Sequence, residues 1–309
     1  MSVLTPAAAD VAAPEPSVAR TTGRRSPRLV LTIALFLLPA VALVAVLMIL
    51  PFLETIYRSF FVDNGFTRTW AGVDNYVTLF TSAGFGQTVL NTLMWVAGTL
   101  ALPVVIGLLV AVGTHGLRWG NAARFSLVLP YALSGAATAV VWTFVLRDDG
   151  ALNGGLAALG LADLQQGWLL HWPLNTVVMI LASTWQGTGV AVILFLIGLQ
   201  AIPPSTVEAA RLDGASGVRL FWHITLPQLR PITVVVVGIS VVNSLKTFDI
   251  VWLLTQGGPG TASETLALSM YRETFTLARY GAGAAVAVVL TLVVVAASWI
   301  YLRRQLRTS

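Results

Sequence analysis

Long apolar stretches separated by short polar segments dominate the hydropathy pattern of this chain. A helix needs roughly 20 residues to cross the hydrocarbon core of a bilayer. Six stretches meet that length, and we place them at Leu29–Leu50, Thr88–Val112, Phe125–Leu146, Leu174–Gly198, Ile232–Leu254 and Gly281–Leu302. The pattern therefore predicts an all-α integral membrane protein with six transmembrane helices.

Composition supports a membrane protein and excludes several kinds of site. The 309 residues are 56% hydrophobic and 10% charged, whereas soluble domains are about 25% charged. Cysteine is absent, which excludes disulfides, a thiolate nucleophile and cysteine-ligated metals. The three histidines, His115, His171 and His223, show no ligand spacing, so we predict no metal site.

Basic residues are distributed unevenly between the two sides of the predicted membrane. If the N-terminus is cytoplasmic, the inner side carries Arg20, Arg24, Arg25, Arg28, Arg118, Arg124, Arg211, Arg219, Arg230, Arg303, Arg304 and Arg307, and the outer side carries Arg58, Arg68, Arg147, Arg272 and Arg279. Cytoplasmic loops are normally the more basic ones. We therefore predict that both termini are cytoplasmic. The net charge of +5 follows from this asymmetry, and no nucleic-acid partner is needed to explain it.

The polar segment between the fourth and fifth stretches predicts a short surface helix. Pro203-Pro204 would end the fourth span. Ser205 would then cap a new helix, with Glu208 three residues later completing a capping box. Ala209-Ala210 leaves one face of this helix flat, and Gly214 offers the left-handed residue that ends it. Such a helix could fit a groove on a partner protein, or it could simply lie on the bilayer.

The spacing in this segment resembles a known signature. It reads Glu208-Ala209-Ala210, three residues, Gly214, nine residues, Ile224-x-Leu226-Pro227, with Asp213 and Phe221 also in the expected places. This resembles the loop that permease subunits of binding-protein-dependent ABC importers present to their ATPase. Phe248 to Pro259, with Thr265 and Tyr271 downstream, and the stretch Trp70 to Phe80 resemble the sugar and glycerol-phosphate branch, in particular its maltose-type first permease.

The resemblance covers residues 29–302 and implies the type I permease fold of ABC importers in a bacterial plasma (inner) membrane. The implied organisation is a disordered cytoplasmic tail (1–28), the first transmembrane helix with an outer loop (29–87), the permease core (88–302) with its coupling loop (203–230), and a second cytoplasmic tail (303–309). The partners implied are a second homologous permease, a dimer of ATPase subunits, an extracytoplasmic solute-binding protein and membrane lipid.

We predict no cofactor on this chain, with ATP and Mg²⁺ held by the partner ATPase subunits. The phosphate-binding pattern G-x-x-x-x-G-K-[ST] is absent, because the only lysine, Lys246, follows Leu245. We therefore predict that the chain is not an enzyme. In the family the loop from Glu208 to Gly214 would couple ATP-driven closure of the ATPase to movement of the spans.

A path for the solute requires polar groups inside the bilayer, where they are rare and costly. We predict that this path includes Asn243, Ser244, Lys246, Thr247 and Asp249 of the fifth span and Trp185, Gln186 and Gly187 of the fourth. Lys246 and Asp249 could pair if both lie on one helix, three residues apart. Alternatively, Lys246 reaches the outer interface along its aliphatic stem. Because Lys246 is positively charged, an anionic or phosphorylated solute is an alternative to a neutral one.

Two other classes of protein would leave different marks in the spans. A stand-alone secondary transporter or channel would be expected to place ion-coordinating carboxylates within its spans, where Asp249 is the one clear example. An intramembrane enzyme would require a nucleophile with its base, or a set of metal ligands, and no such constellation stands in the spans. We therefore expect a transport subunit for a sugar or a related solute.

Overall fold

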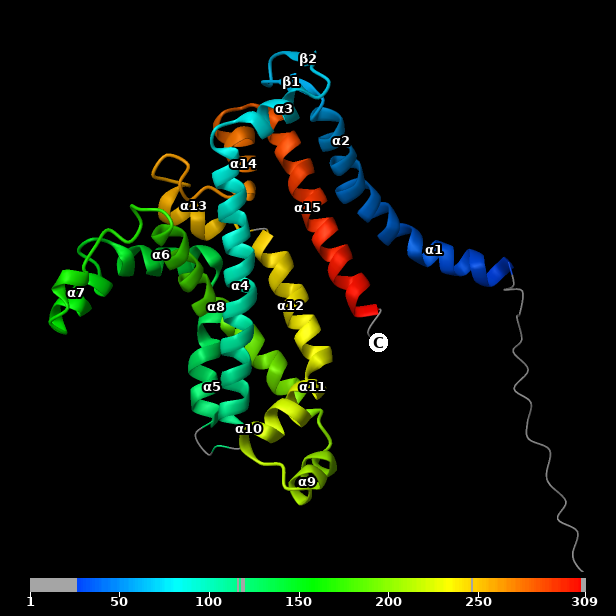
Figure 1. The fold of residues 1–309 in the computed structure, drawn as a ribbon. Coiled ribbons are helices and arrows are strands. Elements are labelled where there is room, and N and C mark those ends of the chain that lie inside the picture. The colour runs from blue at the N-terminus through cyan, green and yellow to red at the C-terminus, as the bar shows by residue number, and fades with distance from the viewer. Residues whose placement is uncertain (1–26, 116, 118–119, 246, 307–309) are drawn as a thin grey trace, which may run out of the picture. The chain divides into compact units, whose positions relative to one another are not determined.

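The computed structural model describes residues 27–115, 117, 120–245 and 247–306 (Figure 1). The chain forms two units, residues 1–52 and 53–309. The helices in chain order are α1 (Pro27–Val44), α2 (Leu50–Arg58), α3 (Asp74–Thr81), α4 (Phe85–Thr114), α5 (Gly120–Val128), α6 (Gly135–Leu146), α7 (Ala151–Ala158), α8 (Leu174–Gln200), α9 (Pro204–Leu212), α10 (Gly217–Leu220), α11 (Leu226–Gln228), α12 (Arg230–Leu245), α13 (Asp249–Thr255), α14 (Leu266–Tyr271) and α15 (Tyr280–Leu306). Two short strands, β1 (Phe61–Asp63) and β2 (Arg68–Trp70), form one antiparallel hairpin.

Four helical segments of the described chain are long and apolar enough to cross a membrane by themselves: Leu35–Arg58, Phe85–Thr114, Leu174–Gln200 and Tyr280–Trp299. Two bent helix pairs bring the number to six if each counts as one crossing. These are Arg124–Ala132 with Gly135–Ala158, bent by 108°, and Gly217–Gln228 with Arg230–Leu245, bent by 69°. Residues 27–28 of the first predicted tail belong to α1 and residues 303–306 of the second belong to α15, and the rest of both tails lies outside the described residues.

The third predicted span is not one continuous helix. Its first part, α5, ends at Val128 and passes into a 3-10 turn, Leu129–Ala132. Pro130 lies in this turn, where it supplies no backbone N–H. A new helix, α6, then begins at Gly135, and the Ser134 hydroxyl accepts the Ala137 N–H at 3.1 Å. The span predicted over Phe125–Leu146 is therefore two helices joined at a bend that contains Pro130.

The fifth predicted span is also broken. Helix α12 ends at Leu245, residues 247–248 are not helical, and α13 starts at Asp249. An acidic residue in the first turn of a helix is favoured by the helix dipole, and Asp249 occupies that position in α13. The continuous helix assumed over Ile232–Leu254 was therefore wrong, because residues 247–248 interrupt it.

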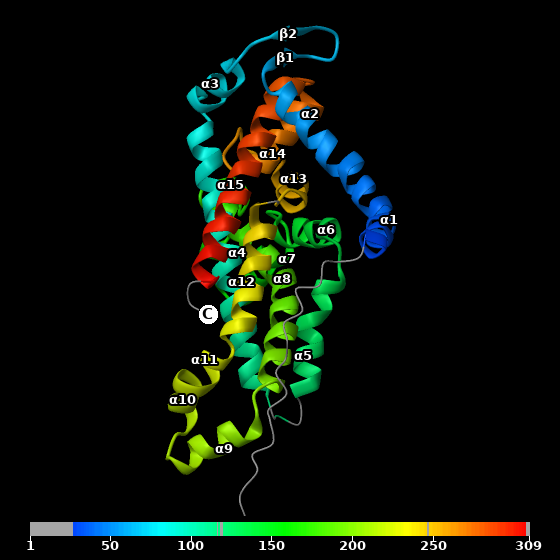
Figure 2. The same cartoon turned by 90° about the vertical axis from the view of Figure 1, so that its right-hand side faces the viewer.

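Helices α4 and α8 lie side by side at the centre of the second unit (Figures 1 and 2), with α12 against α4 and α15 against α12. Small residues permit this close approach. A Cβ placed on Gly107 of α4 would lie 2.6 Å from the Ala191 Cβ of α8, and one placed on Gly98 would lie 2.5 Å from the Ile180 side chain. Trp95 and Phe195, both fully buried, lie in the two apolar clusters that this helix pair forms with its neighbours.

The two ends of the second unit carry different elements. Helices α9, α10 and α11 lie at one end, which we call the α9 end, and the hairpin lies at the other, the hairpin end (Figures 1 and 2). The hairpin is held by the Asn75 amide, which donates to the Ser59 and Phe61 carbonyls at 2.8 Å each. The Tyr76 hydroxyl lies 2.7 Å from the Ser59 hydroxyl. The motif Trp70 to Phe80 thus includes residues that fix this turn of the chain.

Candidate functional site

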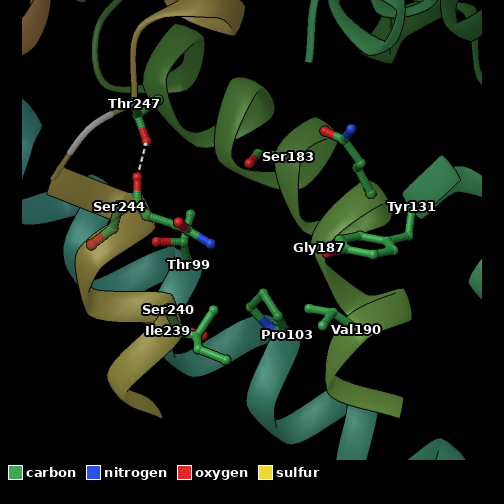
Figure 3. Close-up of a pocket in the computed structure, with 12 residues that line it drawn as sticks. Thr99, Pro103, Tyr131, Ser183, Gly187, Val190, Ile239, Ser240, Ser244 and Thr247 are labelled. Carbon is green, nitrogen blue, oxygen red and sulfur yellow. Dashed lines mark hydrogen bonds between the residues drawn. The ribbon is translucent and has the colours of Figure 1, made fainter. Parts of the chain in front are cut away.

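A pocket of about 260 Å³ lies between α4, α8 and α12 in the second unit (Figure 3). We call it the central pocket. Its lining residues are Thr99 and Pro103 of α4, Tyr131 of the 3-10 turn, Ser183, Gln186, Gly187 and Val190 of α8, Ile239, Ser240, Asn243 and Ser244 of α12, and Thr247. Both broken spans contribute to it, the third through Tyr131 and the fifth through the end of α12 and Thr247.

The lining is polar but carries no charge among the described residues. Eight of the twelve side chains have a hydroxyl or an amide, and the remainder are small or apolar. Tyr131 adds the face of an aromatic ring beside these groups (Figure 3). A surface of this kind can exchange hydrogen bonds with hydroxyl groups of a ligand without having to desolvate an ion.

Five of the predicted path residues lie in the central pocket: Gln186, Gly187, Asn243, Ser244 and Thr247. Four more polar positions line the pocket outside the predicted set: Thr99, Tyr131, Ser183 and Ser240. Ser240 could have been found, because Ser240, Asn243, Ser244 and Thr247 follow the i, i+3, i+4, i+7 spacing of one helix face. Thr99 and Tyr131 carried no comparable signal, since each stands alone in an apolar stretch.

Three predicted path residues are not described as part of this pocket. Trp185 makes an edge-to-face contact with Trp142 at 6.1 Å between ring centroids. Asp249 begins α13 beside Gly135, where a built Cβ would lie 2.9 Å from the Asp249 Oδ2. Lys246 lies outside the described residues. Because residues 247–248 are not helical, the helical spacing assumed for a Lys246–Asp249 pair does not hold. The path roles of these three residues stay predictions.

Side chains from neighbouring helices support the backbone where the third span breaks. The Gln186 amide of α8 donates to the Leu133 carbonyl at 2.5 Å. Leu133 follows the 3-10 turn and is not part of either helix of the broken span. Backbone polar groups freed by a break within a membrane must find another partner, and Gln186 provides one while also lining the central pocket.

The α9 loop ends as the sequence predicted. Gly214 has φ +85°, in the left-handed region that glycine adopts without strain. The Ala215 N–H donates to the Ala210 carbonyl at 2.9 Å, and the Gly214 N–H donates to the Arg211 carbonyl at 3.0 Å. These two bonds form the Schellman motif, and Asp213 stands at the C-cap. The helix therefore stops abruptly at a fixed point.

The start of α9 differs from the prediction. The helix begins at Pro204, with Pro203 at the N-cap, and the N-cap makes no side-chain hydrogen bond. Proline is favoured at the first helical position because its φ is already helical and its missing N–H has no helical partner there. Ser205 consequently lies inside the helix, and the predicted capping box with Glu208 was wrong.

Helix α9 has two different faces. Pro204, Val207, Glu208 and Arg211 line a second cavity of about 360 Å³, together with Leu220 and Thr225 of the loop and His115 after α4. On the other face Ser205 and Ala209 are exposed and Leu212 is 89% exposed. Ala210 is buried. Glu208 and the two alanines, predicted as one docking face, therefore point in different directions.

The downstream half of the loop is partly packed. Ile224 and Leu226 are half-buried and Pro227 is exposed. Leu229, just after α11, is fully buried in the apolar cluster with Phe195 and Ala191 of α8. The motif thus connects α9 to the core through α10 and α11.

Comparison with known proteins decides the family. Residues 103–307 match the family described as binding-protein-dependent transport system inner membrane component. The chain belongs to this family. It is a membrane-spanning permease subunit of an ABC importer, and its role is transport, not catalysis. The prediction of a permease subunit is confirmed, and the alternative of a stand-alone transporter or channel is not.

Named relatives match the permease along most of its length. The osmoprotective compounds uptake permease protein GgtC of Synechocystis is 34% identical over 84% of this chain and 94% of its own. The sulfoquinovosyl glycerol transport system permease protein SmoG of Agrobacterium fabrum is 32% identical over 94% and 98%. The lactose transport system permease protein LacF of Rhizobium radiobacter is 30% identical over 86% and 91%.

The fold is also similar to that of a solved importer. A chain of the bacterial ABC transporter that imports the acidic polysaccharide alginate superposes with a TM-score of 0.78, covering 90% of this permease and 96% of that chain at 24% identity. This likeness confirms the predicted permease fold. The β1–β2 hairpin is a small addition to the all-α architecture that the sequence predicted.

Proposed function

We propose that this permease carries a neutral, polyhydroxylated solute, a sugar or a glycoside of a small polyol, through the central pocket. The observation that carries the proposal is the lining itself, in which eight side chains offer hydroxyl or amide groups and no described residue is charged. Sugars are recognised by groups of this kind placed beside an aromatic face, which Tyr131 supplies. The name of LacF, a lactose permease, agrees with such a solute, whereas the sulfoquinovosyl glycerol of SmoG carries a sulfonate and agrees only with the glycoside part.

The proposed assembly has this chain and a second homologous permease forming the path, with two ATPase subunits on the cytoplasmic side and a solute-binding protein outside. ATP and Mg²⁺ belong to the ATPase subunits. The α9 end then faces the cytoplasm of a bacterium and the hairpin end faces outward across the plasma membrane. The basic residues favour this orientation, since Arg211, Arg219 and Arg230 lie near the α9 end.

Coupling to ATP hydrolysis is proposed to act through the exposed face of α9. Leu212 is 89% exposed and Val218 and Trp222 are 74% and 59% exposed, which is unusual for three large apolar side chains on one short polar loop. Contact with an ATPase subunit would bury them. The Schellman turn at Gly214 keeps the end of α9 at a fixed place, so a push on the helix would reach α12 through α10 and α11.

Substitution of Leu212 tests the coupling proposal. The change Leu212→Glu disturbs little packing within the described chain, because Leu212 is 89% exposed. We expect the membrane subunit to fold and to lose ATPase subunits during co-purification, with solute-stimulated ATP hydrolysis falling at least about tenfold, the effect of roughly 1.4 kcal/mol of lost binding. The matched control is Leu164→Glu, since Leu164 is 56% exposed outside the α9 loop. Equal co-purification of ATPase with both variants would contradict this role of α9.

The solute class is tested separately with the assembled transporter. ATP hydrolysis is measured with the transporter's own solute-binding protein and a panel of neutral di- and trisaccharides, polyol glycosides and sugar phosphates. The proposal expects stimulation by neutral compounds of the panel. Stimulation by the phosphorylated compounds alone would contradict it.

A further inference from the structure

The fifth span breaks beside the central pocket, and one hydroxyl from outside the span contacts the break. Thr247 lies between α12 and α13, where the backbone is not helical, and its side chain lines the pocket. The Thr247 hydroxyl donates to the Asn243 carbonyl at 3.4 Å (Figure 3). Its own carbonyl accepts from the Thr265 hydroxyl at 3.3 Å. Thr265 itself does not line the pocket.

Thr265 belongs to a buried segment that follows α13. We call residues 262–266 the strap. Ser263, Glu264, Thr265 and Leu266 are all buried, with Thr265 only 2% exposed. The Thr265 hydroxyl also caps α14, because it accepts the Leu268 N–H at 3.3 Å. One side chain thus joins the start of α14 to the broken part of the fifth span.

The strap is fixed to α4 by side chains that do not line the pocket. The Asn91 amide donates to the Ala262 carbonyl at 2.8 Å and to the Glu264 carbonyl at 3.0 Å. The Thr92 hydroxyl accepts the Leu266 N–H at 3.1 Å. Asn91 is fully buried, and its carbonyl oxygen accepts from the Trp172 indole at 3.0 Å. These bonds place the strap relative to the continuous helix α4.

We propose that Thr265 is a positioning residue for the central pocket, through which the strap sets the position of Thr247 on the pocket wall. This rests on the proposed function only in taking the central pocket as the solute site. Thr265 touches no solute in this scheme. It holds a backbone carbonyl that the break in the helix leaves without a helical partner. A shift of the strap would therefore move the part of the wall that carries Thr247.

A thiol reporter in the pocket tests this directly. The natural chain has no cysteine, so Ser183→Cys, on the α8 wall, introduces the only thiol of this subunit. The complete transporter in nanodiscs, without nucleotide, is treated with a small charged methanethiosulfonate, and labelling of this subunit is followed by mass. Thr265→Val removes both the bond to the Thr247 carbonyl and the cap of α14. We expect it to accelerate labelling by at least roughly 2- to 10-fold, the factor that corresponds to the loss of one of these hydrogen bonds.

Three further variants separate positioning from general loosening. Thr265→Ser keeps the hydroxyl and is expected to restore the original labelling rate. Thr291→Val in α15 removes a hydroxyl that donates only to its own helix, to the Ala287 carbonyl at 2.8 Å, and should leave the rate unchanged. Thr92→Val removes one of the bonds that hold the strap to α4 and should also accelerate labelling, which keeps the test usable if Thr265→Val fails to assemble.

The outcomes are distinct. Unchanged labelling in both Thr265→Val and Thr92→Val, or equal acceleration by Thr291→Val, would overturn the positioning role. The labelling rate needs neither transport nor a known solute, so failure of the sugar proposal would leave this result intact. Conversely, a transporter that carries neutral sugars and shows no change in labelling would refute only the role of Thr265.

Discussion

The continuous pair α4–α8 and the broken third and fifth spans are held in different ways. The pair relies on close apolar contact, in which Gly98 and Gly107 leave room for Ile180 and Ala191. The broken spans rely on side-chain hydrogen bonds to backbone carbonyls, from Gln186 to Leu133 and from Thr265 to Thr247. Each break is thus supported by a polar side chain from elsewhere in the chain, and both breaks border the central pocket.

This difference has an energetic consequence. A larger side chain at a close helix contact crowds its neighbours, and the neighbouring side chains can partly relieve this strain by moving. A lost donor leaves a buried carbonyl unpaired, and that cost remains. Substitutions that remove a polar contact should therefore lower stability more than the few atoms they change would suggest. Substitutions at the apolar contacts should affect stability without a specific effect on transport.

The largest effect is expected where the strap is anchored on α4. Asn91→Leu keeps the size of the side chain but leaves the Ala262 and Glu264 carbonyls and the Trp172 indole without their partner. Each buried unsatisfied group costs about 1–3 kcal/mol. We expect a strong loss of assembled transporter and of thermal stability in detergent. A melting temperature equal to that of the natural protein would show that this network contributes little.

Crowding of the apolar pair should have the next largest effect. Gly107→Leu would place its Cβ 2.6 Å from the Ala191 Cβ, and overpacking of this kind costs about 1–3 kcal/mol. Gly113, on the same helix, has no atom within 4 Å of a built Cβ, so Gly113→Ala is the matched control and should leave stability unchanged or slightly raised. Thermal unfolding of both variants measures the difference. Equal melting temperatures would contradict close packing at Gly107.

The bond at the third break should have a smaller effect on stability and a clear one on transport. Gln186→Glu keeps the shape but cannot donate to the Leu133 carbonyl when ionised, and Gln186→Leu has no donor at all. Loss of one hydrogen bond costs about 0.5–1.5 kcal/mol. Solute-stimulated ATP hydrolysis should fall in both variants, because Gln186 also lines the pocket. If Glu supports full activity, donation to Leu133 is not required.

The smallest effect concerns pH at the strap. Burial raises the pKa of Glu264 above its ordinary value of 4.5, against the opposing attraction of Arg272, whose Nη1 donates to the Glu264 Oε2 at 2.7 Å. A raised pKa means that the folded chain holds this proton more tightly than the unfolded chain. Stability contributed by this group is therefore complete below pH 4.5 and declines as the pH rises through the raised pKa. Thermal unfolding of Glu264→Gln should lack this decline. The same pH profile in both proteins would assign the decline to other groups.

Much of the site could be read from sequence, for identifiable reasons. The spacing around Glu208 and Gly214 identified the α9 loop, because a glycine with positive φ after a short helix has a local cause. Asn243, Ser244 and Thr247 were found because polar side chains stand out in an apolar span. Pro204 was misjudged in favour of Ser205, since both residues are good helix starts and only the backbone geometry separates them.

The breaks in the third and fifth spans could not be foreseen from hydropathy. The third break lies within an apolar run, and the polar residues at the fifth break can equally line a path on one continuous helix, so the pattern reads as one helix in each case. The side chains that support the breaks come from other parts of the sequence. Gln186 is 53 residues from Leu133, and Thr265 is 18 residues from Thr247. Thr99 and Tyr131 were missed for the same reason, because only the folded chain brings them beside α8 and α12.

The central claim is that a neutral sugar-like solute crosses the membrane through the central pocket. Ser240 lines this pocket and is half-buried, so Ser240→Phe places a ring in a space of about 260 Å³. The decisive measurement is ATP-dependent uptake of neutral di- and trisaccharides by proteoliposomes that contain the complete transporter. We predict uptake by the natural protein and a loss of roughly tenfold or more with Ser240→Phe, with ATPase subunits still bound. Undiminished uptake by Ser240→Phe would contradict the claim.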